Sequence, residues 1–192
     1  MAYASSAPYI DPGAQLLLAD VPAPHKALFL DRDGVINTDH GYVHTPERTD
    51  WVPGIFDLAA QARSCGFLVV VVTNQAGIAR GYYDEAQFYR YTQWVHEQFA
   101  SRGAPLLATY FCPHHPDAGL GELKMACSCR KPQPGMLLQA AQDWDIRPAS
   151  SVLVGDQASD IEAARLAGLG QAFRVEGGDW GPALDWIARA VR

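Results

Sequence analysis

Short apolar runs alternate along this chain with longer segments in which apolar residues recur at helical spacing. Residues 67–73, FLVVVVT, are apolar on both faces, as expected for a strand that helices cover on each side. Asp84 is suited to an N-cap, Pro134 to the first turn of a helix, and Gly168 to the end of one. The pattern predicts strands at 27–31, 67–73, 106–111, 151–155 and 171–175, and helices at 54–65, 85–101, 134–144, 158–167 and 182–191.

This alternation predicts an α/β fold with a doubly wound parallel sheet between two helical layers. Acidic residues follow two of the strands: Asp31 and Asp33 come after the first, and Asp156 and Asp160 after a later one. Carboxylates gathered at one edge of a sheet repel each other, so a cation or a charged intermediate is expected to use them. Ligands bind at this edge in open α/β sheets. The alternative for Asp31 and Asp33 is an ordinary turn.

Size and composition indicate the domain organisation, the cellular location and the kinds of partner to expect. The chain has 192 residues, of which 48% are hydrophobic, so we expect one domain at 26–192 after an N-terminal tail at 1–25. The tail has four prolines and no basic start, which argues against a secretory signal and favours the cytoplasm. The net charge of −6 argues against a nucleic-acid partner, and no apolar run is long enough to cross a bilayer.

Three cysteines and a histidine are closely spaced in two short segments: Cys112 and His114 lie in CPHHP, and Cys127 and Cys129 in CSC. Without an export signal, cysteines are expected to be reduced thiols or metal ligands. Three thiolates and one imidazole complete a tetrahedral zinc site and leave no open position, so we predict structural zinc that pins this loop. His115 is an alternative ligand to His114, and free thiols on a flexible loop are the alternative to a metal site.

The order of polar residues along the chain resembles that of haloacid-dehalogenase-like (HAD) phosphohydrolases. The matching positions are Asp31-x-Asp33, Thr73-Asn74, Lys131, Gly155-Asp156 and Asp160. The resemblance implies a Rossmann-like core that hydrolyses phosphate esters, with Asp160 orienting Lys131. Taken singly, Thr73 could cap a strand and Lys131 could be a solvated charge, but chance explains the joint order poorly.

Each position then has an expected role in phosphate-ester hydrolysis. Asp31 would be the nucleophile, and Asp33 would protonate the leaving oxygen and then activate water. Thr73 and Lys131 would hold phosphoryl oxygens. Asp156 would complete a Mg²⁺ site with the Asp31 carboxylate and the Asp33 carbonyl, because Mg²⁺ prefers oxygen ligands.

The spacing of these positions leaves no room for a cap domain. Only 39 residues lie between Asp33 and Thr73, and the cysteine-rich loop fills much of the stretch from there to Lys131. We therefore expect an open cleft. Its walls would be the loops 37–45, 74–81 and 112–131.

Longer segments resemble one family within this superfamily, the D-glycero-D-manno-heptose-1,7-bisphosphate 7-phosphatases. They are DRDGVINTDHGYVH, VVVTNQAGIARG, CPHHP, CSCRKPQPGML and VGDQASDIEAA, within residues 26–175. The resemblance implies a capless monomer with Mg²⁺ and zinc that removes the C7 phosphate of a sugar bisphosphate, for nucleotide-activated heptose and lipopolysaccharide core synthesis. The implied substrate contacts are Asp39, His40, Gly41, Tyr42, Thr73, Asn74, Gln75, Ala76, Arg130 and Lys131.

One residue departs from this family pattern, and three other interpretations compete with it. Gln157 stands where relatives often have lysine, which leaves the preferred anomer open. A histidinol-phosphate phosphatase shares the scaffold, but the DHGY segment and the length of the cysteine-rich loop do not favour it. The acidic charge argues against a polynucleotide 3′-phosphatase. The intact set of catalytic residue types argues against a silent zinc-stabilised binding module.

Overall fold

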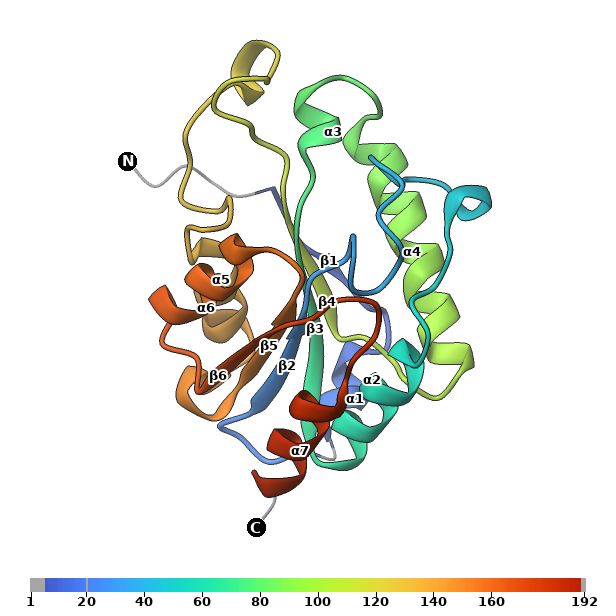
Figure 1. Cartoon of the computed structure of the whole chain (residues 1–192), viewed down its shortest axis with the longest axis vertical. Helices are drawn as coiled ribbons and strands as arrows, with labels where there is room; N and C mark the ends of the chain where they lie inside the picture. Colours follow the sequence, from blue (N-terminus) through green and yellow to red (C-terminus); the bar gives the residue numbers. More distant parts are fainter. Residues whose placement is uncertain (1–5, 20, 191–192) are drawn as a thin grey trace.

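A six-stranded sheet forms the centre of the molecule in this computed structural model, which describes residues 6–19 and 21–190 (Figure 1). The strand order is β1-β4-β3-β2-β5-β6. The strands are β1 (Tyr9–Ile10), β2 (Lys26–Leu30), β3 (Phe67–Asn74), β4 (Ala108–Cys112), β5 (Val152–Gly155) and β6 (Gln171–Arg174). The helices are α1 (Ala14–Ala19), α2 (Ile55–Ser64), α3 (Ala76–Ala79), α4 (Glu85–Ser101), α5 (Gly135–Asp143), α6 (Ala158–Leu166) and α7 (Gly181–Arg189). Short 3-10 turns lie at Pro46–Arg48, Gly121–Leu123 and Pro148–Ser150.

Helices cover both faces of the sheet, so the predicted three-layer α/β architecture is confirmed. Side chains alternate along β3: Val69 and Val71 pack with α2, α4 and α7, whereas Leu68, Val70 and Val72 pack with α1, α5 and α6. This alternation buries a central strand on both sides and explains its unbroken apolar sequence. In Figure 1, α5 and α6 lie on one side of the sheet and α2 and α4 on the other.

The predicted elements agree with the observed ones to within two residues at most ends. Asp84 caps α4 in a capping box. The backbone N–H of Gln87 donates to the Asp84 carboxylate at 2.7 Å, and the Gln87 side-chain oxygen accepts from the backbone N–H of Asp84 at 2.9 Å. The last helix was predicted to extend to residue 191, which lies outside the described residues.

The segment predicted as an N-terminal tail contributes an edge strand and a helix. Tyr9 of β1 pairs antiparallel with Thr109 of β4, so the sheet is parallel except at this edge. Asp11 Oδ2 lies 3.0 Å from His96 Nδ1, and His96 Nε2 lies 2.9 Å from the Thr109 hydroxyl. Ala14, Leu17 and Leu18 of α1 pack in the core on one face of the sheet. Residues 1–5 and 20 of the predicted tail lie outside the described residues, and a domain boundary at residue 25 stays a prediction.

The register of the sheet brings three strand ends together. Leu30 of β2 pairs with Val71 of β3 on one side and with Val154 of β5 on the other. The residues that follow these positions therefore emerge at one edge, as expected for parallel neighbours. None of the described helices is long and apolar enough to cross a membrane.

Candidate active site

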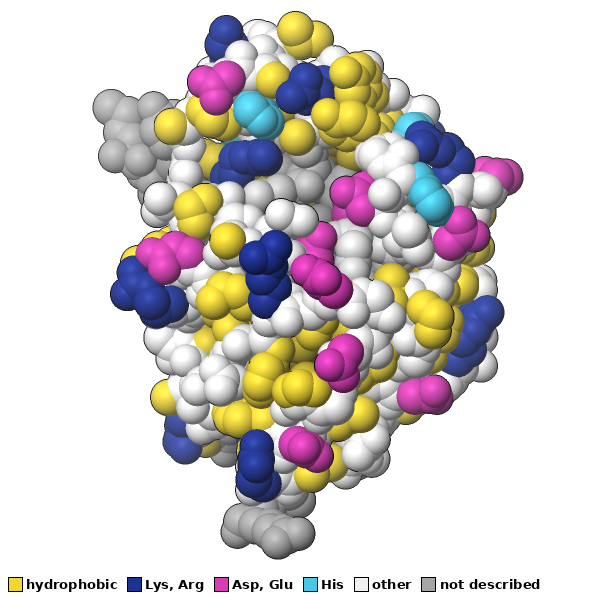
Figure 2. All heavy atoms as spheres, in the orientation of Figure 1, with side chains coloured by type: hydrophobic (Ala, Val, Ile, Leu, Met, Phe, Trp, Pro, Cys, Tyr) yellow, Lys and Arg dark blue, Asp and Glu magenta, His cyan; other side chains and the backbone are white. Residues whose placement is uncertain are grey.

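A cleft of about 440 Å³ opens at this edge of the sheet. In Figure 2, basic and acidic side chains face each other around a hollow in the upper half of the molecule. The lining residues are Asp31, Asp33, Asp39, Gly41, Tyr42, Thr73, Asn74, Gln75, Ala76, Gly77, Tyr83, Arg130, Lys131, Asp156, Gln157, Ser159 and Asp160. All the predicted substrate contacts except His40 are among them; the His40 ring instead lies 2.7 Å from Asp50 Oδ2.

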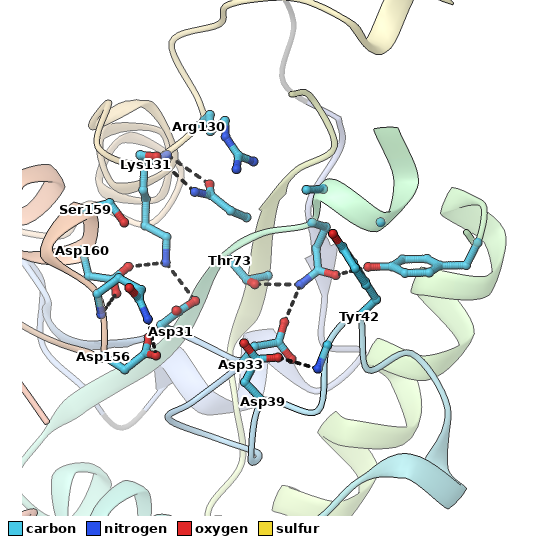
Figure 3. Close-up of a pocket in the computed structure, with 17 residues that line it drawn as sticks. Asp31, Asp33, Asp39, Tyr42, Thr73, Arg130, Lys131, Asp156, Ser159 and Asp160 are labelled. Carbon is cyan, nitrogen blue, oxygen red and sulfur yellow. Dashed lines mark hydrogen bonds and ion pairs between the residues drawn. The ribbon is translucent and has the colours of Figure 1, made fainter. Parts of the chain in front are cut away.

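Lys131 is buried at the floor of the cleft between two carboxylates (Figure 3). Its Nζ lies 2.8 Å from Asp31 Oδ1 and 2.6 Å from Asp160 Oδ1, and it donates to the Val72 carbonyl at 2.8 Å. Burial alone would lower the pKa of Lys131, but attraction to the two carboxylates outweighs it and raises the pKa. The side chain therefore holds a fixed positive charge next to Asp31.

Asp31 lies where β2 ends, with its carboxylate facing Lys131. Its backbone N–H donates to the Val154 carbonyl at 3.0 Å, and Oδ1 accepts from the Arg32 N–H at 2.8 Å. Burial raises the pKa of Asp31 to about 7, although the Lys131 ammonium acts in the opposite direction. The position thus combines a desolvated carboxylate with an adjacent cation, the surroundings that tune a reactive acid.

Asp33 has a different environment, made of hydrogen-bond donors. Its carboxylate accepts from Arg32 Nη2 at 2.8 Å, from Asn37 Nδ2 at 3.0 Å and from Gln75 Nε2 at 3.3 Å. Arg32 is itself buried, with its guanidinium over the Tyr91 ring at 5.2 Å. The sequence analysis did not name Arg32; the available signal was a basic residue between two acids at the end of a strand.

Two glycines allow the acids to approach one another. Gly34 has φ +88°, and a Cβ there would lie 2.4 Å from Asp156 Oδ2, while a Cβ at Gly155 would lie 2.3 Å from the Cβ of Asp160. Carboxylate oxygens of Asp31, Asp156 and Asp160 consequently lie within 4.8 Å of one another. Asp156 Oδ1 is buried and has no hydrogen-bond partner among the described residues. Crowded oxygen ligands with an unpartnered lone pair fit a hard divalent cation such as Mg²⁺.

A second cluster of metal-ligand type lies beyond the cleft, at the end of β4 and on the loop that follows it. The ligand atoms of Cys112, His114, Cys127 and Cys129 all lie within 4.8 Å of one another, as a tetrahedral zinc site requires. Contact with Cys112 lowers the pKa of the Cys129 thiol to about 5. His115 is outside the cluster and accepts from backbone N–H groups of the loop. The structure therefore groups His114 with the cysteines.

The cysteine-rich loop is tied directly to the cleft. Arg130 follows Cys129 and donates from Nη1 to the His114 carbonyl at 3.1 Å. Asn74 holds the backbone of Lys131 at both ends, accepting from its N–H at 3.0 Å and donating to its carbonyl at 3.1 Å. The position of Lys131 therefore depends on β3 and on the cysteine-rich loop together.

Two lining residues, Tyr83 and Ser159, lie outside the predicted contacts and cleft walls, whereas Gly77 lies within the predicted wall 74–81. Tyr83 and Gly77 lie in contact, since a Cβ on Gly77 would come within 2.2 Å of the Tyr83 ring. Tyr83 reaches the cleft because the segment after α3 turns back on that helix, with the Tyr82 N–H donating to the Gly77 carbonyl at 2.9 Å. A single aromatic residue in a loop carries no periodic signal that could have indicated this.

Comparisons with known proteins agree with a phosphatase site of the HAD type. A family model described as HAD-hydrolase-like matches residues 128–179. The D-glycero-alpha-D-manno-heptose-1,7-bisphosphate 7-phosphatase of Burkholderia mallei is 52% identical over 151 residues, covering 79% of this chain and 80% of that protein. The chain belongs to the heptose-1,7-bisphosphate 7-phosphatase family. A D-glycero-beta-D-manno-heptose-1,7-bisphosphate 7-phosphatase from Yersinia pestis is 44% identical over 86% of this phosphatase and 90% of that protein.

Solved structures confirm the HAD fold of this heptose-1,7-bisphosphate 7-phosphatase family member. A candidate HAD-like phosphatase from Mesorhizobium loti superposes with a TM-score of 0.83 at 33% identity, covering 90% of each chain. The D,D-heptose 1,7-bisphosphate phosphatase of B. bronchiseptica, in complex with magnesium and phosphate, gives 0.67 at 37% identity over 76% of this phosphatase and 78% of that chain. The predicted family and enzyme class are thus both confirmed.

The contact between Gly34 and Asp156 yields a first prediction. We expect Gly34→Ala to lower phosphatase activity by at least about tenfold, because the new methyl group displaces Asp156 and the left-handed backbone becomes strained. The matched control is Gly66→Ala, which has a similar φ of +77° but no atom within 4 Å of the new Cβ. Both variants should lose about 1 kcal/mol or more of unfolding free energy in urea melts. Equal activity of the two variants would contradict the prediction.

Proposed function

We propose that this phosphatase removes the C7 phosphate of D-glycero-D-manno-heptose 1,7-bisphosphate. The observation that carries the proposal is the contact of Lys131 with Asp31, beside Asp33 and Thr73, in a capless cleft. The relatives from Burkholderia mallei and Yersinia pestis bear names that state this reaction. The product would serve nucleotide-activated heptose and lipopolysaccharide core synthesis. We propose a cytoplasmic monomer without nucleic-acid or membrane partners.

The proposed mechanism uses Asp31 and Asp33 in two half-reactions. An Asp31 oxygen attacks phosphorus, the bond to the sugar oxygen breaks, and Asp33 gives its proton to that oxygen. Asp33 then takes a proton from water as the water attacks the phosphorus of the aspartyl-phosphate, which releases phosphate and restores Asp31. The Lys131 ammonium and the Thr73 hydroxyl stabilise the phosphoryl oxygens throughout. Asp160 keeps Lys131 oriented through the 2.6 Å contact.

Magnesium is the proposed cofactor of the cleft. The Asp31 and Asp156 carboxylates and the Asp33 backbone carbonyl would hold it, as oxygen ligands suit this ion. When bound, it would neutralise negative charge on the phosphoryl group and on the clustered acids. The unpartnered Asp156 Oδ1 supports this assignment, as does the magnesium complex of the B. bronchiseptica relative.

Zinc is the proposed structural ion of the cysteine-rich loop, held by Cys112, His114, Cys127 and Cys129. All four ligand positions would come from the protein, so this ion would have no site for substrate. Its role would be to fix the loop that carries Arg130 and Lys131.

Substrate selection is assigned to the loops of the open cleft. Asp39, Gly41 and Tyr42 on one side, and residues 74–76 on the other, offer hydrogen-bonding groups to a polyhydroxylated ligand. His40 lies outside the lining, so a contact from it would require the loop to move. Arg130 is the proposed reader of the distal C1 phosphate, because a guanidinium can bind phosphate through two hydrogen bonds.

The reaction itself is tested with a substrate panel and two variants. Phosphate release should be faster from heptose bisphosphate, as either the α or the β anomer, than from fructose 1,6-bisphosphate or histidinol phosphate. Asp31→Asn should abolish turnover, because an amide cannot form the acyl-phosphate, and Asp33→Asn should lose about 10²- to 10⁴-fold. Near wild-type rates for Asp31→Asn would contradict the mechanism. A preference for histidinol phosphate would contradict the assignment of the substrate.

A metal prediction follows for the cysteine-rich loop. The purified protein should contain about one zinc per chain by elemental analysis. Cys127→Ser should lower both melting temperature and phosphatase activity, because a loosened loop displaces Lys131. Cys65→Ser is the matched control, because Cys65 lies outside the cluster. This variant should retain both zinc and activity. Fully active wild-type protein without zinc would refute the assignment.

The distal-phosphate role of Arg130 is tested with two substrates. Arg130→Ala should lower kcat/KM for the bisphosphate by about one to two powers of ten. This corresponds to a loss of about 1.5–3 kcal/mol of transition-state stabilisation, because a hydrogen bond to a charged group is removed. Heptose 7-phosphate lacks the distal group and should be affected much less. Equal losses would mean that Arg130 acts on the reacting phosphate, or on the loop through its bond to the His114 carbonyl.

A further inference from the structure

A chain of buried hydrogen bonds runs from Tyr83 to the proposed catalytic groups. The Tyr83 hydroxyl donates to Gln75 Oε1 at 2.5 Å, and Gln75 Nε2 donates to Thr73 Oγ1 at 2.8 Å and to Asp33 Oδ2 at 3.3 Å. Gln75 is 1% exposed and Tyr83 4% exposed, so water competes little for these bonds. The bonds that end at Thr73 and Asp33 can be followed in Figure 3.

The direction of these bonds fixes which way the Gln75 amide faces. A glutamine amide has an oxygen that only accepts and a nitrogen that only donates. With its oxygen bonded to Tyr83, its nitrogen must face Asp33 and Thr73. The reversed amide would set its oxygen against the Asp33 carboxylate. Its nitrogen could then donate to the Tyr83 oxygen, but the buried phenol proton would lose the acceptor that Gln75 Oε1 provides.

Tyr83 is well suited to hold this orientation. Burial raises the pKa of Tyr83 to about 12, so the phenol keeps its proton at neutral pH. Its ring stacks on His44 with centroids 4.4 Å apart, packs in a small core with Phe88, and lies against the backbone of Gly77, which has no room for a Cβ. The hydroxyl is therefore held in one place relative to Gln75, which lies between β3 and α3.

We propose that Tyr83 is a positioning residue for the proton transfer by Asp33. It acts through Gln75: the phenol fixes the amide, and the amide nitrogen holds the Asp33 carboxylate at the side of the cleft where the leaving oxygen must be protonated. This inference rests on the proposed role of Asp33 as general acid. It adds a residue that does not itself touch the reacting atoms.

The dependence of the rate on the leaving group tests the proposal. In Tyr83→Phe the ring remains and only the hydroxyl is lost. For heptose bisphosphate, whose alkoxide leaving group needs a proton, kcat/KM should fall about tenfold, the effect of about one neutral hydrogen bond. For p-nitrophenyl phosphate, whose leaving group departs without a proton, kcat/KM should change less than about threefold, because general-acid assistance adds little there.

Two further variants separate positioning from a general loss of structure. Tyr110→Phe is the matched control, since it removes another phenol with a buried ring and a bond to Asp143 at 2.7 Å, outside the cleft lining. It should leave both rates unchanged. In a Gln75→Met background, Tyr83→Phe should have no further effect on kcat/KM, because the group it orients is gone.

Different outcomes would contradict the positioning role of Tyr83 and the proposed function. Equal losses for both phosphate esters, no loss in Tyr83→Phe, or additive effects of the two substitutions would each overturn the positioning role. A wild-type enzyme that releases no phosphate from heptose bisphosphate would instead overturn the proposed function, and this inference with it.

Discussion

The rest of the site depends on one interaction, the pairing of the buried Lys131 ammonium with the carboxylates of Asp31 and Asp160. A charge that is removed from water must be paired, and removal of one partner from a buried pair is strongly destabilising. Its partners come from separate parts of the chain: Asp31 follows β2, Asp160 lies on α6, and the Val72 carbonyl belongs to β3. The fold and the site are therefore constrained together, because a shift in the register of β2 or β3 would separate the lysine from its acceptors.

Asp31 and Asp33, which are separated by a single residue, acquire different surroundings from this arrangement. Asp31 faces Lys131 in a desolvated position, whereas Asp33 turns toward Arg32, Asn37 and Gln75, which all donate to it. A nucleophile benefits from a nearby cation that stabilises the charge of the transferred group. A group that must give and take a proton at one place benefits from donors that fix its carboxylate there, as these three side chains do. The difference supports the separate roles proposed for the two residues.

The sequence was sufficient for the features that repeat or have a fixed spacing. The apolar run of β3, the N-cap at Asp84 and the cysteine-rich cluster could each be predicted from a few neighbouring residues. The edge strand β1 could not, because two residues carry too little pattern to distinguish a strand from a tail. The choice between His114 and His115 and the place of Tyr83 in the cleft depend on how loops pack, and residue types alone do not contain that information.

The absence of a cap within the described residues gives the loops around the cleft a larger task. An open cleft has no second domain to exclude water and select the substrate, so its walls must be rigid on their own. The two walls are joined: the Leu120 N–H, near the tip of the cysteine-rich loop, donates to the Ala79 carbonyl at the end of α3 at 2.8 Å. A metal that fixes the cysteine-rich loop would therefore also brace the segment after α3, which carries Tyr83. On this view the cluster at Cys112 would support both Lys131, proposed to neutralise the phosphoryl group, and Tyr83, proposed to orient Gln75.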